Sequence, residues 1–281
     1  MLLTVLPAGS VDGPLAAAAP LPEPHAFLAQ VRARLHTDDY LLDQYTFTEK
    51  QTERHFDGKG KVKKITSAVY EVYPSPEPGQ TYRKLIAQDG KPLSAEELAR
   101  EDRKQEAKEA RAWGRLSDND AQKRAAAEKS RRQENQAIEE LFRIEDFRIA
   151  GRETLDGRSS ILVTFSPRAE VEPATKAGKI FKKFAGKAWI DEGDHQLVRV
   201  EAELIDDFSI GFGFLARLKK GARAHLQRRK INDEIWLPAQ MRFVGSARVL
   251  LVKGVHIDAL SEYSDYKKFT VGTESAVVPQ R

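Results

Sequence analysis

The chain has 281 residues, no cysteine, and a formal net charge of +4 that results from 46 Lys and Arg against 42 Asp and Glu. This length can bury a sizeable core, and all-β chains of this size often form one domain. The absence of cysteine excludes disulfides, thiolate catalysis and cysteine-ligated zinc. The small and mixed charge is not that of a dedicated nucleic-acid binder, so we expect no nucleic-acid partner.

Residues 1–24 are rich in Ala and Pro and contain no Lys or Arg. We interpret them as a poorly ordered tail or as a poorly formed or truncated signal segment, because a secretory signal has a basic start and an unbroken apolar stretch. Residues 25–270 are expected to form a single domain, and residues 271–281 a C-terminal tail. No stretch is apolar enough over a sufficient length to span a bilayer, so we expect a protein that does not span the membrane.

The first expected element is a helix from Pro24 to Leu35. Phe27, Leu28, Val31 and Leu35 recur there at helical spacing. Such a stripe gives a helix one apolar side. We therefore expect this helix to cover one end of a sheet.

Short runs of alternating apolar and polar residues fill most of the remaining chain. Three Asp-Gly pairs, beginning at Asp57, Asp89 and Asp156, separate some of them, and Asp-Gly favours the tight turns of β-hairpins. In the clearest run, Val198, Val200, Ala202 and Leu204 alternate with charged residues, which predicts a strand with one wet face. Further strands are predicted at Thr81 to Gln88, Phe208 to Leu218, Glu234 to Phe243 and Ala247 to Val252. In the hairpin around Asp156, Phe147 and Ile149 should pair with a strand that carries Ile161, Val163 and Phe165.

The pattern changes at about residues 94–143, where Ala, Glu, Lys, Arg and Gln predominate. Ser94 and Glu97 have the spacing of a capping box, which predicts the start of a helix. The Gly114 to Asp120 region should break this insertion into two helices. Because acidic and basic residues alternate finely, we favour a solvated helical face, with a lid or a docking arm for a partner as the alternative.

The sequence contains no compact catalytic motif. Its six histidines are scattered, without the spacing of a metal site, so we expect no metal, no cofactor and no catalytic residue. His195 lies beside Asp191 and Asp194, but the three belong to an expected hairpin turn, and we interpret them as solvated turn residues.

The strongest positive feature is the segment from Phe208 to Leu218. Apolar side chains should occupy one face of this predicted strand, while glycines reduce the bulk on the other. Glycine permits a strand to bend, so these side chains could line the concave wall of an open barrel, with plain core packing as the alternative. Our full set of candidate ligand-binding residues is Phe208, Ile210, Phe212, Phe214, Trp189, Trp236 and Met241.

A resemblance to a known family is based on several short sequence segments. They are Tyr-Thr-Phe-Thr at 45–48, Gly-Lys-Ala-Trp-Ile-Asp at 186–191, Leu-Val-Arg-Val at 197–200, Asp-Glu-Ile-Trp-Leu-Pro at 233–238 and Ser-Asp-Tyr-Lys-Lys-Phe at 264–269. Over roughly residues 25–270 the chain resembles the LolA-like outer-membrane lipoprotein-sorting proteins and periplasmic lipoprotein carriers. The resemblance implies a periplasmic location and an open half-barrel with helices covering its concave side. The helical insertion is longer than the lid elements of that family.

The fold class expected from these observations is mainly β with a helical insertion (α+β), built on a large curved antiparallel sheet. The leading functional hypothesis is a non-enzymatic periplasmic carrier or sensor that binds a lipid or lipoprotein acyl chain in an apolar cavity. The alternative is a structural or interaction protein of the cell envelope with a self-filled core, which docks a partner through the helical insertion. An enzyme acting on a lipid or glycan would need carboxylates or histidines converging inside the cavity.

Overall fold

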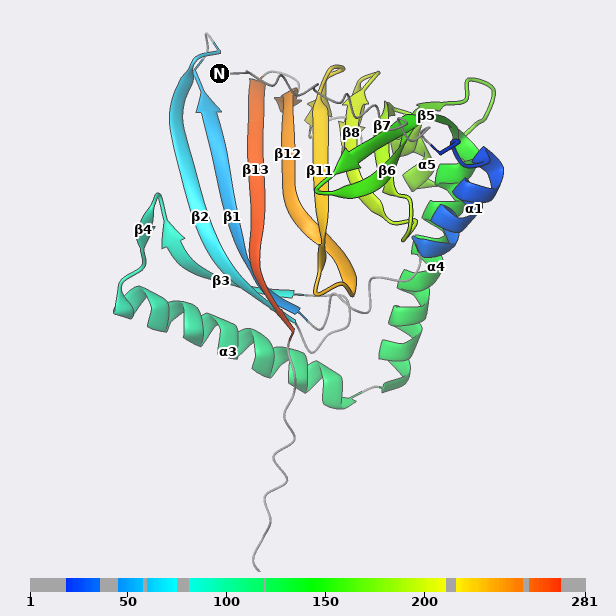
Figure 1. The fold of residues 1–281 in the computed structure, drawn as a ribbon. Helices are drawn as coiled ribbons and strands as arrows, with labels where there is room; N and C mark the ends of the chain where they lie inside the picture. The colour runs from blue at the N-terminus through cyan, green and yellow to red at the C-terminus, as the bar shows by residue number, and fades with distance from the viewer. Residues whose placement is uncertain are drawn as a thin grey trace, which may run out of the picture.

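A single antiparallel sheet dominates the molecule (Figure 1). The computed structural model describes residues 19–35, 45–57, 60–74, 81–118, 120–210, 216–249 and 253–268. Within them the strands are β1 (Tyr45–Phe56), β2 (Val62–Pro74), β3 (Thr81–Gln88), β4 (Lys91–Pro92), β5 (Glu145–Leu155), β6 (Arg158–Pro167), β7 (Phe184–Asp191), β8 (Leu197–Leu204), β9 (Phe208–Ile210), β10 (Ala216–Leu218), β11 (Arg223–Ile231), β12 (Ile235–Val249) and β13 (Lys253–Lys268).

The sheet is open. Its strands follow the order β4, β3, β2, β1, β13, β12, β11, β8, β7, β6, β5, and β10 pairs with β12 and with β9. The two edge strands of this path, β4 and β5, do not pair with each other. The expected fold class is confirmed, since the structure is mostly one large open antiparallel sheet with few helices.

The described helices are α1 (Pro24–Arg34), α3 (Ala95–Asp118), α4 (Asp120–Ile144) and α5 (Lys176–Phe181). The predicted N-terminal helix is confirmed, and the Glu23 carboxylate caps it by accepting hydrogen bonds from the N–H groups of His25 and Ala26. The predicted capping box is confirmed as well, because Glu97 accepts from the Ser94 N–H at 2.8 Å and the Ser94 hydroxyl accepts from the Glu97 N–H at 3.3 Å.

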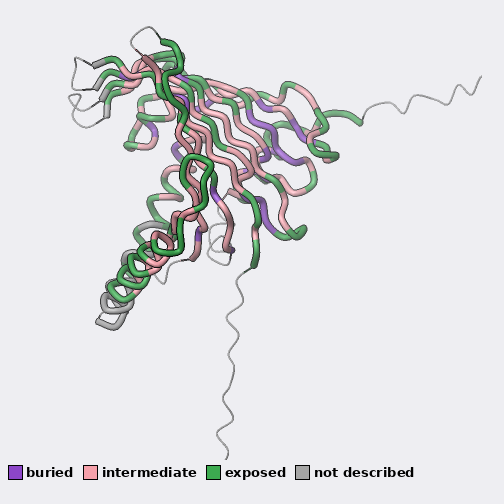
Figure 2. Tube along the Cα trace, turned by 90° about the vertical axis from the view of Figure 1, so that its left-hand side faces the viewer, coloured by how far each residue is buried: buried purple, intermediate pink, exposed green. Residues whose placement is uncertain are grey.

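Helices α3 and α4 together connect β4 with β5, the two edges of the sheet (Figure 1). The break between them falls inside the predicted Gly114 to Asp120 region. No side chain from Ala95 to Arg111 is buried, and the buried segments in Figure 2 lie mainly in the strands. The prediction of a largely solvated helical insertion is therefore confirmed for the described side chains of α3.

Two Asp-Gly turns have the backbone that hairpins require. Asp89 and Gly90 have φ angles of 47° and 77°, and Asp156 and Gly157 have 49° and 78°. Two successive positive φ angles characterise the turn type that matches the twist of paired strands. The predicted pairing across Asp156 is confirmed, with Phe147 opposite Phe165 and Ile149 opposite Val163. Gly58, in the third pair, lies outside the described residues.

Three strand predictions were wrong in detail. The segment from Phe208 to Leu218 is two short antiparallel strands, β9 and β10, because the chain reverses between them. The separate strands predicted at Glu234 to Phe243 and Ala247 to Val252 are parts of one strand, β12. Gly245 lies inside this strand, and a Cβ there would lie 2.7 Å from the Ala222 Cβ, so the glycine permits close packing against Ala222. Val198 leaves the face of Val200, since a register shift in β8 places it in a cluster with Trp189.

The two faces of the sheet carry different contacts. Phe27 and Val31 of α1 pack in one cluster with Ile161, Val163, Ala188 and Ile190, and we call this face of the sheet the helix face. Directly paired residues share a face. The helix face therefore continues from Val200 through Leu226 to Met241. Trp189 lies on the opposite face, because it alternates with Ala188 and Ile190.

Replacing Gly186 in β7 with Ala is expected to lower the free energy of unfolding by about 1–3 kcal/mol. A Cβ at this position would lie 2.0 Å from the Glu201 carbonyl oxygen and 2.9 Å from the Ala202 Cα, both in the backbone of the neighbouring strand. Gly254→Ala is the matched control, since a Cβ there meets nothing within 4 Å. Chemical denaturation of both variants gives the difference. Equal stability would show that β7 and β8 are not packed this closely.

Candidate functional site

An apolar cavity of about 360 Å³ lies between the helix face of β5 to β8 and the helices α1, α4 and α5. Figure 1 shows these three helices grouped beside that end of the sheet. The described lining residues are all apolar: Leu28, Val31, Leu35, Leu141, Phe142, Phe147, Val163, Phe165, Ile180, Phe181, Phe184, Ala188, Ile190, Leu197, Val200 and Ala202. The sheet supplies the floor of the cavity, and the three helices supply its roof.

The local sequence explains this shape. Leu28, Val31 and Leu35 repeat every three or four residues in and just after α1, which turns them all toward the sheet. On the floor, Ala188 and Ala202 place small side chains where larger ones would fill the space. Aromatic rings form one wall, with the Phe142 and Phe147 centroids 5.1 Å apart.

A groove of about 520 Å³ adjoins the cavity, and Leu28, Phe142 and Phe147 line both of them. Its other lining residues are His25, Ala29, Arg32, Ala33 and Arg168. The basic side chains of Arg32 and Arg168 therefore lie directly beside the apolar cavity. The Arg32 guanidinium lies over the Phe142 ring at 5.7 Å, and its Nε donates to Glu139 at 2.9 Å.

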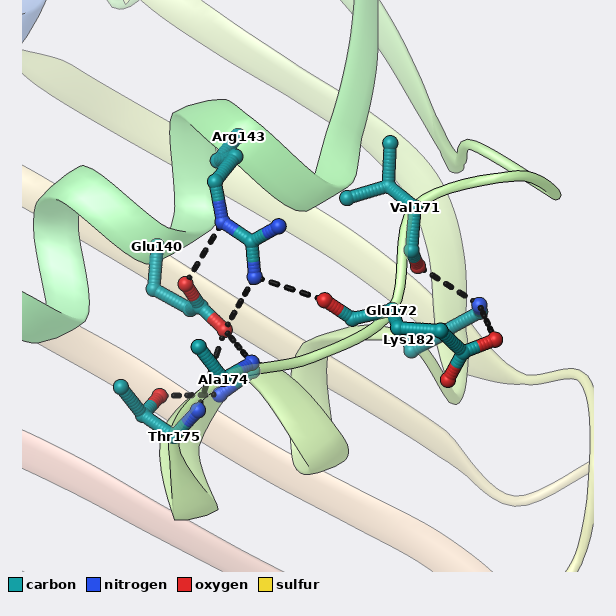
Figure 3. A network of polar contacts seen from close by, with 8 residues as sticks. Glu140, Arg143, Val171, Glu172, Ala174, Thr175 and Lys182 are labelled. Atoms are coloured by element: carbon teal, nitrogen blue, oxygen red, sulfur yellow. Dashed lines mark hydrogen bonds and ion pairs between the residues drawn. The ribbon is translucent and has the colours of Figure 1, made fainter.

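The roof is tied together by a buried carboxylate of α4, Glu140, shown in Figure 3. It accepts hydrogen bonds from the N–H groups of Ala174 at 2.6 Å and Thr175 at 3.2 Å, just before α5. It also accepts two from the Arg143 guanidinium, each at 2.9 Å. The Arg143 hydrogen bond, followed by these backbone donors, lowers the pKa of the Glu140 carboxyl against the opposing effect of burial. We call these residues the Glu140 network.

Where α4 meets β5, the side chain of Glu145 is buried. Its Oε2 atom has no hydrogen-bond partner among the described residues. Burial alone raises the pKa of this carboxyl from 4.5 to about 7, because desolvation disfavours the charged form. Glu145 does not line the cavity, so the raised pKa bears on how the roof joins the sheet and not on chemistry at the ligand.

The cavity can hold an apolar group but offers no chemistry toward it. None of its described lining side chains can act as an acid, a base or a nucleophile. Across the ranges that the structure describes, no three His, Asp or Glu side chains gather in a way that could hold a metal ion. Among the described helices, none combines the length and apolar character needed to cross a membrane.

The candidate residues from the sequence lie elsewhere. Trp189 and Trp236 are buried in a cluster with Val198, and their Nε1–H groups donate to Glu153 at 2.8 Å and to Asp194 at 2.9 Å. This cluster lies on the face of the sheet opposite α1. Neither tryptophan lines the cavity.

Met241 lies on the helix face but beyond the helices, with 46% of its surface exposed, and its sulfur accepts a hydrogen bond from the Tyr263 hydroxyl at 3.4 Å. Phe208 and Ile210 lie in β9, opposite Leu218 and Ala216 of β10. Phe212 and Phe214 are outside the described residues. Phe208 and Met241 do not line the cavity, and the part played by all seven candidate residues in ligand binding remains a prediction.

Much of the cavity was nevertheless visible as separate patterns in the sequence. The stripe of α1 and the strand face of Val163 and Phe165 each predicted an apolar surface. Leu141 and Phe142 of α4, and the short helix α5, gave no signal that they belong beside these surfaces. Their place depends on the order of the strands, which brings the end of α4 next to α1.

The chain is similar in fold to several solved structures of low sequence identity. A DUF1329 family protein from Desulfovibrio piger is 13% identical, with a TM-score of 0.28 over 90% of this chain and 95% of the other. An outer membrane lipoprotein-sorting protein domain from Vibrio parahaemolyticus is 10% identical, with a TM-score of 0.31 over 88% and 93%. A LolA superfamily protein from Nitrosomonas europaea is 8% identical, with a TM-score of 0.27 over 91% and 97%.

No protein-family model and no curated protein matches the sequence. Two of these three structures are a lipoprotein-sorting protein domain and a LolA superfamily protein. The short sequence segments named above show a resemblance to the same groups. At these identities and TM-scores the similarities support no statement about ligands or partners, so a function has to be inferred from the cavity itself.

Proposed function

We propose that this protein is a non-enzymatic periplasmic carrier or sensor that holds a lipid or lipoprotein acyl chain in the apolar cavity. The observation that supports the proposal most is the uniformly apolar lining between the helix face and α1, α4 and α5. Ligand sites usually include a few polar groups that fix orientation. A lining without any suits a ligand part that has no polar atoms, such as a hydrocarbon chain.

The energetics fit this proposal. Each methylene moved from water into an apolar site contributes about 0.8 kcal/mol. Ten buried methylenes would contribute about 8 kcal/mol before the costs of immobilising the chain, which is enough for useful affinity without any hydrogen bond. The absence of acids, bases and nucleophiles from the described lining agrees with carriage of the ligand and not with its conversion.

The decisive experiment for this function is native mass spectrometry of the protein purified from its own envelope fraction, followed by organic extraction and lipid identification. A stoichiometric lipid is the expected result. Repeated recovery of ligand-free protein that takes up no apolar probe would overturn the proposal. That outcome would favour the alternative function, an envelope interaction protein that docks a partner through the helical insertion of α3 and α4.

Filling the cavity should weaken ligand binding without unfolding the protein. We expect Ala202→Phe to weaken uptake of a fluorescent apolar probe about tenfold or more, because the new ring occupies the space of the chain. Ala185→Phe is the matched control, since Ala185 lies on the opposite face of the neighbouring strand. Probe titrations and thermal unfolding of both variants are the measurements. Equal uptake by the two variants would place the binding site elsewhere.

A further inference from the structure

We infer that the basic groove beside the cavity takes the anionic head of a single-chain amphiphile, a carboxylate or a phosphate, while the chain occupies the cavity. This inference rests on the proposed function and adds the chemical class of the ligand. The groove is lined by His25, Arg32 and Arg168 together with apolar residues, and none of its described lining residues is acidic.

Continuity between the two spaces is the first argument. Leu28, Phe142 and Phe147 line both the cavity and the groove, so one molecule can extend from one into the other. The polar end of such a molecule would meet the groove, because the described lining residues of the cavity include no hydrogen-bonding side chain. A ligand that is apolar at one end and anionic at the other matches this arrangement.

The groove's positive charge is the second argument. Arg32 is paired with Glu139, but Arg168 forms no ion pair with any described residue. Arg168 is fixed in place because its N–H donates to the Ile144 carbonyl at 2.8 Å and its Nε donates to the Glu145 carbonyl at 3.2 Å. Its two terminal nitrogens remain as donors, and a guanidinium of this kind suits the two oxygens of a carboxylate or phosphate.

The size of the cavity is the third argument. Ligand pockets usually measure roughly 300–1,000 Å³, and a cavity of about 360 Å³ lies at the small end of that range. It suits one chain better than two or three. A single-chain anion therefore satisfies both the volume of the cavity and the charge of the groove.

The test compares four ligands that share one chain and differ only in the head: laurate, dodecyl phosphate, dodecanol and dodecyltrimethylammonium. Their affinities are measured by displacement of a fluorescent apolar probe from the full-length protein and from two variants. Arg168→Gln removes the unpaired charge. Arg148→Gln is the matched control, because it removes an exposed charge from the opposite face of β5.

We expect the two anions to bind the unaltered protein more tightly than dodecanol, and the cation to bind most weakly. Arg168→Gln should weaken the anions about three- to tenfold and leave dodecanol unchanged, while Arg148→Gln should change none of them. The tighter of the two anions identifies the source, a fatty acid or a phosphate-bearing lipid. Equal affinity for all four heads would overturn the inference and leave the proposed function intact. Displacement by none of them would overturn both.

Discussion

Replacing Glu140 with Ala is expected to lower the free energy of unfolding by about 2–4 kcal/mol and to speed the release of a bound probe. The carboxylate is almost fully buried, and its removal leaves the N–H groups of Ala174 and Thr175 and part of the Arg143 guanidinium without acceptors. Unsatisfied donors in such a place are costly. The loss should concern the contact between α4 and α5, the two helices that the Glu140 network joins over the cavity (Figure 3).

The Glu140 network leaves no space for a side chain at the neighbouring position 178. A Cβ at Gly178 of α5 would lie 2.2 Å from a Glu140 carboxylate oxygen, so only glycine fits beside it. Arg143 also donates to the Glu172 carbonyl at 2.7 Å, which ties the same loop a second time. Because the pKa of Glu140 is lowered in the folded protein, its contribution to stability is present at neutral pH and is lost as the pH falls through that lowered value.

Glu139→Ala provides the control for Glu140→Ala. Glu139 is the preceding residue of α4, and its ion pair with Arg32 is about half exposed on both sides, so we expect a change of about 0–1 kcal/mol. Urea denaturation measures both stabilities, and stopped-flow dilution measures probe release. Similar values for the two variants would mean that Glu140 does not hold the roof of the cavity.

The sequence predictions succeeded where the interactions join residues that are close to each other in the chain. The pairing of Phe147 with Phe165 was predictable because the turn at Asp156 is local and sets the register. The capping box at Ser94 is likewise a contact between residues three apart. These features depend on neighbours in the chain, and neighbours can be read from the sequence.

The assembly of the apolar surfaces into one cavity was not predictable, because it depends on distant parts of the chain. Phe142 and Leu28 are more than a hundred positions apart, and they meet only after the order of the strands is set. Irregularities caused other errors. One extra residue in β8 moved Val198 to the face of Trp189, since side chains on a strand alternate with a period of two. Trp189 and Trp236, two of the aromatic candidates from the sequence, lie in a buried cluster outside the cavity, and their part in ligand binding remains a prediction.

The sharpest pH dependence should come from Glu145. Its pKa is raised from 4.5 to about 7, so the folded state binds a proton more tightly than the unfolded state does. A raised carboxyl pKa means that stability is greatest below about pH 4.5, falls as the pH rises toward 7, and is constant above that. At 1.36 kcal/mol for each pH unit, the loss is at most about 3 kcal/mol.

Glu145→Gln should remove this loss, because a neutral amide of the same shape replaces a carboxylate that is charged at high pH. We expect the variant to be more stable than the unaltered protein by about 2–3 kcal/mol near pH 8, and of similar stability near pH 4. Glu170→Gln, which removes an exposed carboxylate, is the control and should show no such difference. Denaturation curves from about pH 4 to pH 8 measure the stability of both variants. If Glu145→Gln gains the same stability at pH 4 as at pH 8, the burial of the Glu145 carboxyl is not the cause of the gain.

The position of Glu145 gives this titration a consequence for the cavity. The residue begins β5 directly after Ile144 ends α4, so it connects the roof of the cavity with its floor. Its carbonyl accepts from Arg168, and the Ile144 carbonyl accepts from the Arg168 N–H. A charge on the buried carboxyl would destabilise this junction first. Hydrogen exchange at residues 140–147 should therefore accelerate between about pH 5 and pH 8, beyond the intrinsic effect of pH, and Glu145→Gln should abolish the excess.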